Sequence, residues 1–82
     1  MWLAKVYVTL KPLVNDPQGL TIQGALQNLG FGAVRSVRAG KYFEVRLDVP
    51  ERAEAERAVG DMCSRLLANP VIEDYRFEIV PA

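Results

Sequence analysis

The stretch LLANPVIEDY, residues 66–75, decides the fold class of this chain. Its first part closes an apolar helical pattern, and Pro70 stops the helix because proline has no amide hydrogen and clashes with the preceding turn. Its second part leads into a run where Tyr75, Phe77 and Ile79 alternate with charged residues, which is typical of a half-buried strand. A helix, a proline stop and a strand are therefore expected here.

Two patterns in the N-terminal part indicate a strand and a helix. The even positions from Trp2 to Leu10 are all apolar, which predicts a strand with one buried face. Asp16-Pro17 is a helix start, because aspartate can accept hydrogen bonds from free backbone N–H groups and proline suits the first helical position. Apolar residues at helical spacing follow, and they predict a helix that ends near Gly30.

The central part predicts a hairpin followed by a second helix. Two strands are expected over 33–39 and 41–48, turned tightly around Gly40. Pro50 then opens a helix with one apolar side. The buried stripe of this helix is expected to contain Ala55, Ala58, Val59, Met62, Cys63 and Leu66.

The resulting element order is β-α-β-β-α-β, in one domain over residues 1–82. Because βαβ crossovers are right-handed, this order predicts an α+β, ferredoxin-like fold. Its four-stranded antiparallel sheet would have the strand order 4-1-3-2, with both helices on one face. The two outer strands would have unpaired edges, so we expect a homodimer, and the sequence leaves further pairing of dimers open.

Composition argues against several classes of protein. Ten basic and ten acidic side chains cancel, whereas a protein that binds nucleic acid normally carries a basic face. No apolar run has the length of a membrane span, and no secretory signal is expected. The chain has no histidine and one cysteine, so we expect no internal disulfide, no metal site and a cytoplasmic location.

Few side chains offer reactive or binding chemistry. Cys63 is the one strong nucleophile candidate, but it falls in an apolar stripe and has no histidine as a base, so we interpret it as a core residue. The central hairpin has four cations that could hold a phosphate or an acidic partner, although a solvated face is the favoured interpretation. These cations are Arg35, Arg38, Lys41 and Arg46.

Exposed apolar and aromatic residues pose a separate question. Leu13 and Val14 lie in a short connection, where they either fold back or meet a partner, and the sequence leaves both open. Tyr7 and Tyr42 are expected to share the sheet face away from the helices. Two aromatics on a sheet can stack bases, but the zero net charge disfavours that interpretation.

Three motifs connect the chain with a known family: NDPQG at 15–19, VRAGK at 37–41, and the stretch 66–75. In this order and at this spacing they resemble PurS, the family of small subunits of bacterial and archaeal phosphoribosylformylglycinamidine synthase. The resemblance extends from the first predicted strand into the last. Ala39 stands where the family more often has valine, a change that keeps the strand apolar.

The resemblance implies a subunit that is not itself the catalyst. Members of this family dimerise and bridge a glutaminase subunit, which releases ammonia, and a synthetase subunit, which binds ATP and formylglycinamide ribonucleotide. They are thought to support ammonia transfer. This chain would bind no cofactor, while the complex uses ATP and Mg²⁺. We assign partner contacts to Leu13, Val14, Arg38, Lys41 and Asn69.

Two other families share the predicted element order. A stand-alone regulatory module of the ACT type would bind a small molecule and dimerise, although such modules are usually fused to an enzyme. An acylphosphatase-like enzyme would need an arginine in the loop after the first strand, where this chain offers only Lys11 and backbone groups. Fold alone cannot separate these alternatives.

Overall fold

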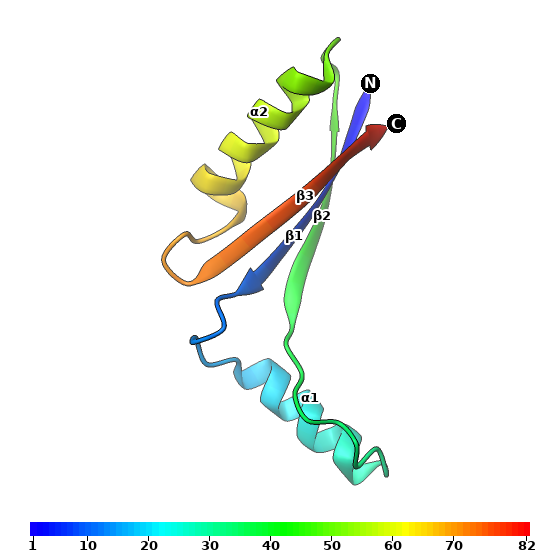
Figure 1. Ribbon diagram of the computed structural model, residues 1–82, viewed down its shortest axis with the longest axis vertical. Helices are drawn as coiled ribbons and strands as arrows, with labels where there is room; N and C mark the ends of the chain where they lie inside the picture. Colours follow the sequence, from blue (N-terminus) through cyan, green and yellow to red (C-terminus); the bar gives the residue numbers. More distant parts are fainter.

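A three-stranded antiparallel sheet forms the centre of the molecule, in the order β2-β1-β3 (Figure 1). The computed structural model describes residues 1–82. The elements are β1 (Trp2–Leu10), α1 (Pro17–Asn28), β2 (Gly40–Leu47), α2 (Arg52–Met62) with a π-helical turn η1 (Cys63–Leu67), and β3 (Glu73–Pro81). The molecule is elongated, with extents of 50 × 27 × 14 Å.

The core lies between the sheet and α2. Ala4, Val6 and Val8 of β1 are fully buried, which confirms the alternation predicted for this strand. Val6 pairs with Phe43 on one side and with Phe77 on the other. Paired residues of antiparallel strands share a face, so the apolar side chains of all three strands point toward α2.

The helix α2 was predicted correctly in position, but its buried stripe was wrong at one residue. Ala55, Val59 and Cys63 are fully buried, whereas Leu66 is 83% exposed. The physical reason is the π-helical turn, in which the amide of Ala68 bonds to the carbonyl oxygen of Cys63. This wider turn shifts the helical register by one residue, so Leu67 packs against the core instead of Leu66.

The predicted fourth strand, over 33–39, is absent. This segment begins in a turn, has no regular structure after it and pairs with no strand, and the chain runs through Gly40 directly into β2 instead of turning back. The four-stranded ferredoxin-like sheet and the hairpin were therefore wrong for this chain. The observed order β3-β1-β2 is the predicted order 4-1-3-2 without its outer strand.

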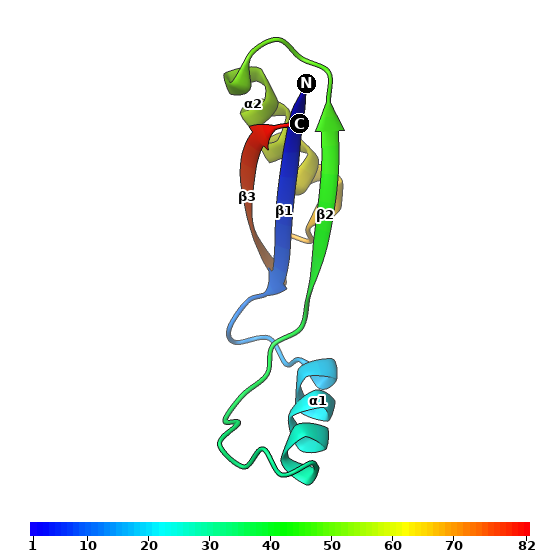
Figure 2. The same ribbon diagram turned by 90° about the vertical axis from the view of Figure 1, so that its right-hand side faces the viewer.

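The helix α1 projects beyond the end of the sheet instead of covering it (Figures 1 and 2). Gly19 is the only residue of α1 that is buried. Both helices were expected on one face of the sheet, and for α1 this was wrong. The reason is that helical spacing reveals an apolar side but not the surface that covers it. Residues 11–39, which leave the sheet and return to it, are called the arm below.

Candidate functional site: the joint between the arm and the sheet

The carboxylate of Asp16 links the two chain segments through which the arm leaves the sheet and returns to it. Oδ1 of Asp16 accepts a hydrogen bond from the amide of Gly19 at 3.0 Å, which is the helix cap predicted from the sequence. Oδ2 accepts a second bond from the amide of Ala39 at 2.8 Å. Asp16 is 5% exposed. These two hydrogen bonds hold the pKa of this carboxyl below its usual range, and the bond from Gly19 has the larger effect.

Arg38 ties the same two connections together from the other side. Its Nη2 donates to the carbonyl oxygen of Lys11 at 2.9 Å and to that of Val14 at 3.0 Å. These two carbonyls belong to the turn after β1, while Arg38 precedes β2. The guanidinium that was predicted to meet a partner thus also organises the base of the arm.

Two glycines allow the close approach that these bonds require. A Cβ at Gly19 would collide with the carbonyl oxygen of Val37, and one at Gly40 would lie 2.5 Å from the carbonyl oxygen of Val8. Only glycine fits both positions without a shift of the backbone. We call the set of Asp16, Gly19, Arg38, Ala39 and Gly40 the joint.

A second ordered turn lies next to the joint. The side-chain oxygen of Asn69 accepts a hydrogen bond from the backbone amide of Val71 at 3.0 Å. The backbone amide of Asn69 donates to Oε1 of Glu73 at 2.7 Å. Lys41 lies 3.3 Å from Glu73, and the backbone bond from Asn69, more than this cation, lowers the pKa of that carboxyl. The amide of Lys11 bonds to the carbonyl oxygen of Ile72 at 2.8 Å, so the turn is linked to the joint.

Apolar side chains are exposed around these two turns. Leu13 is fully exposed, while Val14 is half-buried and its amide bonds back to the carbonyl oxygen of Lys11. Val71, on the Asn69 turn, is 79% exposed. The sequence left open whether these two residues fold back or meet a partner. Val14 folds back in part, whereas Leu13 is free to contact a partner.

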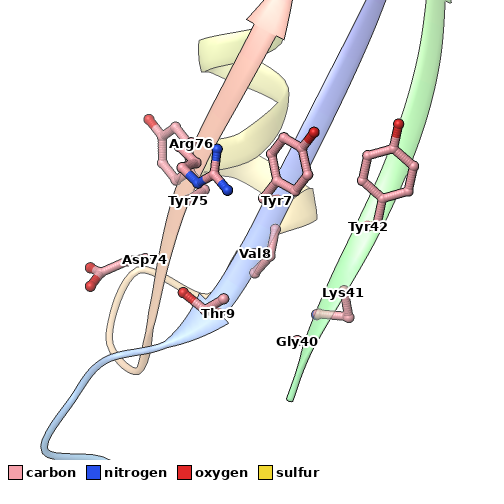
Figure 3. A pocket seen from close by; sticks show the side chains of 9 residues that line it. All are labelled: Tyr7, Val8, Thr9, Gly40, Lys41, Tyr42, Asp74, Tyr75 and Arg76. Carbon is pink, nitrogen blue, oxygen red and sulfur yellow. The ribbon is translucent and has the colours of Figure 1, made fainter. Parts of the chain in front are cut away.

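A shallow hollow of about 340 Å³ lies at the end of the sheet, beside the joint (Figure 3). The rings of Tyr7 and Tyr42 are 5.2 Å apart, as expected for residues that share a face, and the guanidinium of Arg76 lies 4.2 Å above the Tyr7 ring. Partial burial and the hydrogen bond to Glu44 raise the pKa of Tyr42 to about 12. These rings lie on the face of the sheet that α2 leaves uncovered.

The one nucleophile candidate of the sequence lies in the core. Cys63 is fully buried, as its interpretation as a core residue predicted, and burial raises the pKa of its thiol, which disfavours the reactive thiolate. No group of three His, Cys, Asp or Glu residues is placed to hold a metal ion. No helix has the length and apolar character that crossing a bilayer requires.

Comparison with known proteins agrees with the resemblance of the motifs. The family model described as PurS, phosphoribosylformylglycinamidine (FGAM) synthase, matches residues 3–81. The chain is 51% identical to the PurS subunit of that synthase from Synechocystis, over 92% of this chain and 75% of the relative. It is 47% identical to the PurS subunit from Bacillus subtilis, over 96% of this chain and 93% of the relative.

Solved structures support the same assignment. Bacillus subtilis PurS superposes with a TM-score of 0.88 at 46% identity, covering 99% of this chain and 100% of that one. PurS from Methanocaldococcus jannaschii gives a TM-score of 0.90 at 38% identity, covering 100% and 99%. A chain in the structure of PurLQS from Thermotoga maritima gives 0.86 at 27% identity, covering 98% and 99%.

These matches cover the joint, the Asn69 turn and the entire sheet, so they decide against the ACT-type and acylphosphatase-like alternatives. The chain belongs to the PurS family and is a subunit of phosphoribosylformylglycinamidine synthase, an amidotransferase ligase of purine biosynthesis.

Proposed function

We propose that this chain is a non-catalytic assembly subunit that bridges the glutaminase and synthetase subunits and supports transfer of ammonia between them. The observation that carries this proposal is the family match. One of the matching structures is that of PurLQS, whose name includes two further subunits, PurL and PurQ, beside PurS. The elongated shape fits it, because a long molecule can contact two proteins at once. So does the lack of a nucleophile with an adjacent base.

The partner surface in this proposal is the base of the arm. Leu13 would contact a partner, since its side chain is fully exposed and its burial there would remove apolar surface from water. Val14, Arg38, Lys41 and Asn69 would act mainly by holding the turns that present it, because each is bonded within the chain or half-buried.

The remaining features of the proposal follow from the same assembly role. The chain forms a homodimer in the cytoplasm, and it binds no cofactor, while ATP and Mg²⁺ are used by the synthetase subunit. Both β2 and β3 are edge strands with unpaired backbone groups, which supports self-association.

Assembly can be tested directly with purified subunits. The three proteins mixed together should elute from a sizing column as one complex, and Leu13→Asp should abolish co-elution. The control is Ala53→Asp, an exposed position on the charged side of α2. Co-elution that Leu13→Asp leaves intact would refute the surface assignment, and absence of any complex with the unmodified chain would refute the assembly role.

A further inference from the structure

The strand β3 has an outer edge that no other strand covers. It is the last strand of the sheet, and its nine residues, Glu73–Pro81, pair with β1 on one side only. Figure 1 shows β3 in front of the other two strands, and Figure 2 shows it at the side of the sheet with no strand beyond it. An edge strand presents unpaired backbone N–H and C=O groups, which are a template for pairing with another chain.

The usual features that keep an edge strand from pairing are missing from β3. Its register with β1 is unbroken from Glu73 to Pro81, so no bulge bends it away from a second strand. It contains no lysine, and its one proline, Pro81, is its last residue. Its charged side chains are of both signs and alternate with apolar residues. The edge is therefore long, regular and open to a strand of matching charge.

Two hydrogen bonds show which backbone groups of β3 face this edge. The amide of Lys11 bonds to the carbonyl oxygen of Ile72 at 2.8 Å. At the other end, the amide of Ala82 bonds to the carbonyl oxygen of Met1 at 3.1 Å. The even positions thus point their backbone groups toward β1, because the direction alternates along an antiparallel strand. The odd positions point toward the free edge, and they are Glu73, Tyr75, Phe77, Ile79 and Pro81.

We propose that β3 pairs with β3 of a second copy of this chain, antiparallel and across a two-fold axis at Phe77. Phe77 is the middle residue of the strand, so every residue of β3 lies opposite one of the other copy. The two Phe77 residues would exchange both backbone hydrogen bonds, and Tyr75 would lie opposite Ile79. An axis two residues earlier or later would leave one end of each strand without a partner. Two-fold pairing of one surface with itself is the commonest symmetry of oligomers.

The charges of β3 favour this register as well. With the axis at Phe77, Arg76 of each copy lies opposite Glu78 of the other. This pair belongs to the positions without backbone hydrogen bonds, where opposite side chains come closest, and it occurs twice. An axis at Arg76 or at Glu78 would instead place two like charges directly opposite one another, which is destabilising. The sequence of β3 is therefore complementary to itself in the one register that pairs the entire strand.

The pairing would also remove apolar surface from water. Tyr75 is 42% exposed, and its ring stacks on that of Phe77 with the centroids 6.4 Å apart. Both rings lie on the face of the sheet that carries α2, where Phe77 packs against the core. The rings of the two copies would meet across the axis, and aromatic pairs are among the cross-strand contacts that stabilise sheets.

This contact is separate from the bridging role and adds to the homodimer proposed above. It uses β3 alone, so two homodimers formed through another surface would join into a tetramer, and two single chains would join into a dimer. In both cases the mass doubles. One strand from each copy makes a smaller contact than the roughly 1,200–2,000 Å² of a stable interface, so we expect it at high protein concentration.

Reversal of two charges tests the pairing. Arg76→Glu alone and Glu78→Arg alone each place like charges opposite one another. Each should halve the light-scattering mass at about 1 mM protein, a concentration suited to a weak contact. The double variant restores opposite charges and should restore the mass. Arg57→Glu, the same change of charge at an exposed position of α2, should leave the mass unchanged. Single variants with the unmodified mass, or a double variant that stays at half, would contradict the proposal.

Hydrogen exchange of single amides identifies the strand that pairs. The amides of Tyr75, Phe77 and Ile79 should be protected at about 1 mM protein and should exchange fast on dilution, because only the second copy covers them. The amides of Arg76 and Glu78 face β1 and should be protected at both concentrations. Fast exchange of the first three at high concentration would overturn the proposal. Protection that appears only with an added glutaminase or synthetase subunit would also overturn it, while leaving the bridging role standing.

Discussion

The carboxylate of Asp16 and the amide of Ala39, 23 positions apart in sequence, are joined by a hydrogen bond of 2.8 Å. The other oxygen of Asp16 caps α1 through Gly19. One side chain therefore starts the helix and fixes where the chain re-enters the sheet. The direction of the arm depends on this double contact, because α1 itself packs against none of the strands to a significant extent.

Asp16→Ser separates the two functions of this carboxylate. Serine still caps the helix, but its single oxygen cannot also reach Ala39. We expect the melting temperature of Asp16→Ser to fall by less than that of Asp16→Ala, for which a loss of about 4–8 °C is typical of a missing cap in a small domain. Thermal melts of both variants at equal protein concentration measure this difference. Equal melting temperatures for the two variants would show that the cap contributes nothing, and a Ser variant as stable as the unmodified chain would show the same for the bond to Ala39.

Acid should weaken the joint and the Asn69 turn together. The pKa of Asp16 lies below its ordinary value of 3.8 and that of Glu73 below 4.5, because backbone amides stabilise both carboxylates in the folded state. A depressed pKa contributes stability above the unfolded value, and this contribution is lost as the pH falls. The melting temperature should therefore drop as the pH is lowered through this range. Asp16→Ser should show a shallower drop, and an identical profile would contradict this origin.

Two glycines of α1 provide a contrast in stability. Gly19→Ala should lower the free energy of unfolding by about 1–3 kcal/mol, since its methyl group collides with the carbonyl oxygen of Val37. Gly24→Ala has open space around it and should raise this free energy by up to about 1 kcal/mol through helix propensity. Urea denaturation at fixed protein concentration distinguishes the two. If both substitutions stabilised the protein, the close approach at the joint would be refuted.

Much of this fold could be predicted because local patterns determined it. The alternation from Trp2 to Leu10, the Asp16 cap and the proline stop at Pro70 each depend on neighbours in sequence, and all three are observed. The hairpin around Gly40 failed for a different reason. A flexible glycine permits a turn as readily as a close approach to Val8, and only tertiary contacts decide between them.

The candidate site was predictable only in part. Leu13 could be singled out as an exposed apolar residue, and the structure shows it fully exposed. The bonds of Arg38 to Lys11 and Val14 could not be foreseen, because they join segments that are distant in sequence. The π-helical turn that exposes Leu66 had no signal in the apolar spacing either.

The single core beneath α2 predicts where truncation is costly. Val59→Ala removes buried methyl groups from a fully buried residue and should cost about 2 kcal/mol, including the cavity left behind. Val71→Ala, at a residue 79% exposed, should change the free energy of unfolding by less than about 0.5 kcal/mol. Denaturant unfolding of both variants tests the contrast, and similar losses would contradict the position of the core.

The most direct test of the assembly role is the activity of the synthase reconstituted from purified subunits. The glutaminase and synthetase subunits should show little glutamine-dependent amidation without this chain and regain it when the chain is added. Amidation driven by added ammonia should change much less, because a bridging subunit matters only when ammonia passes between two proteins. Full glutamine-dependent activity in the absence of this chain would contradict the account.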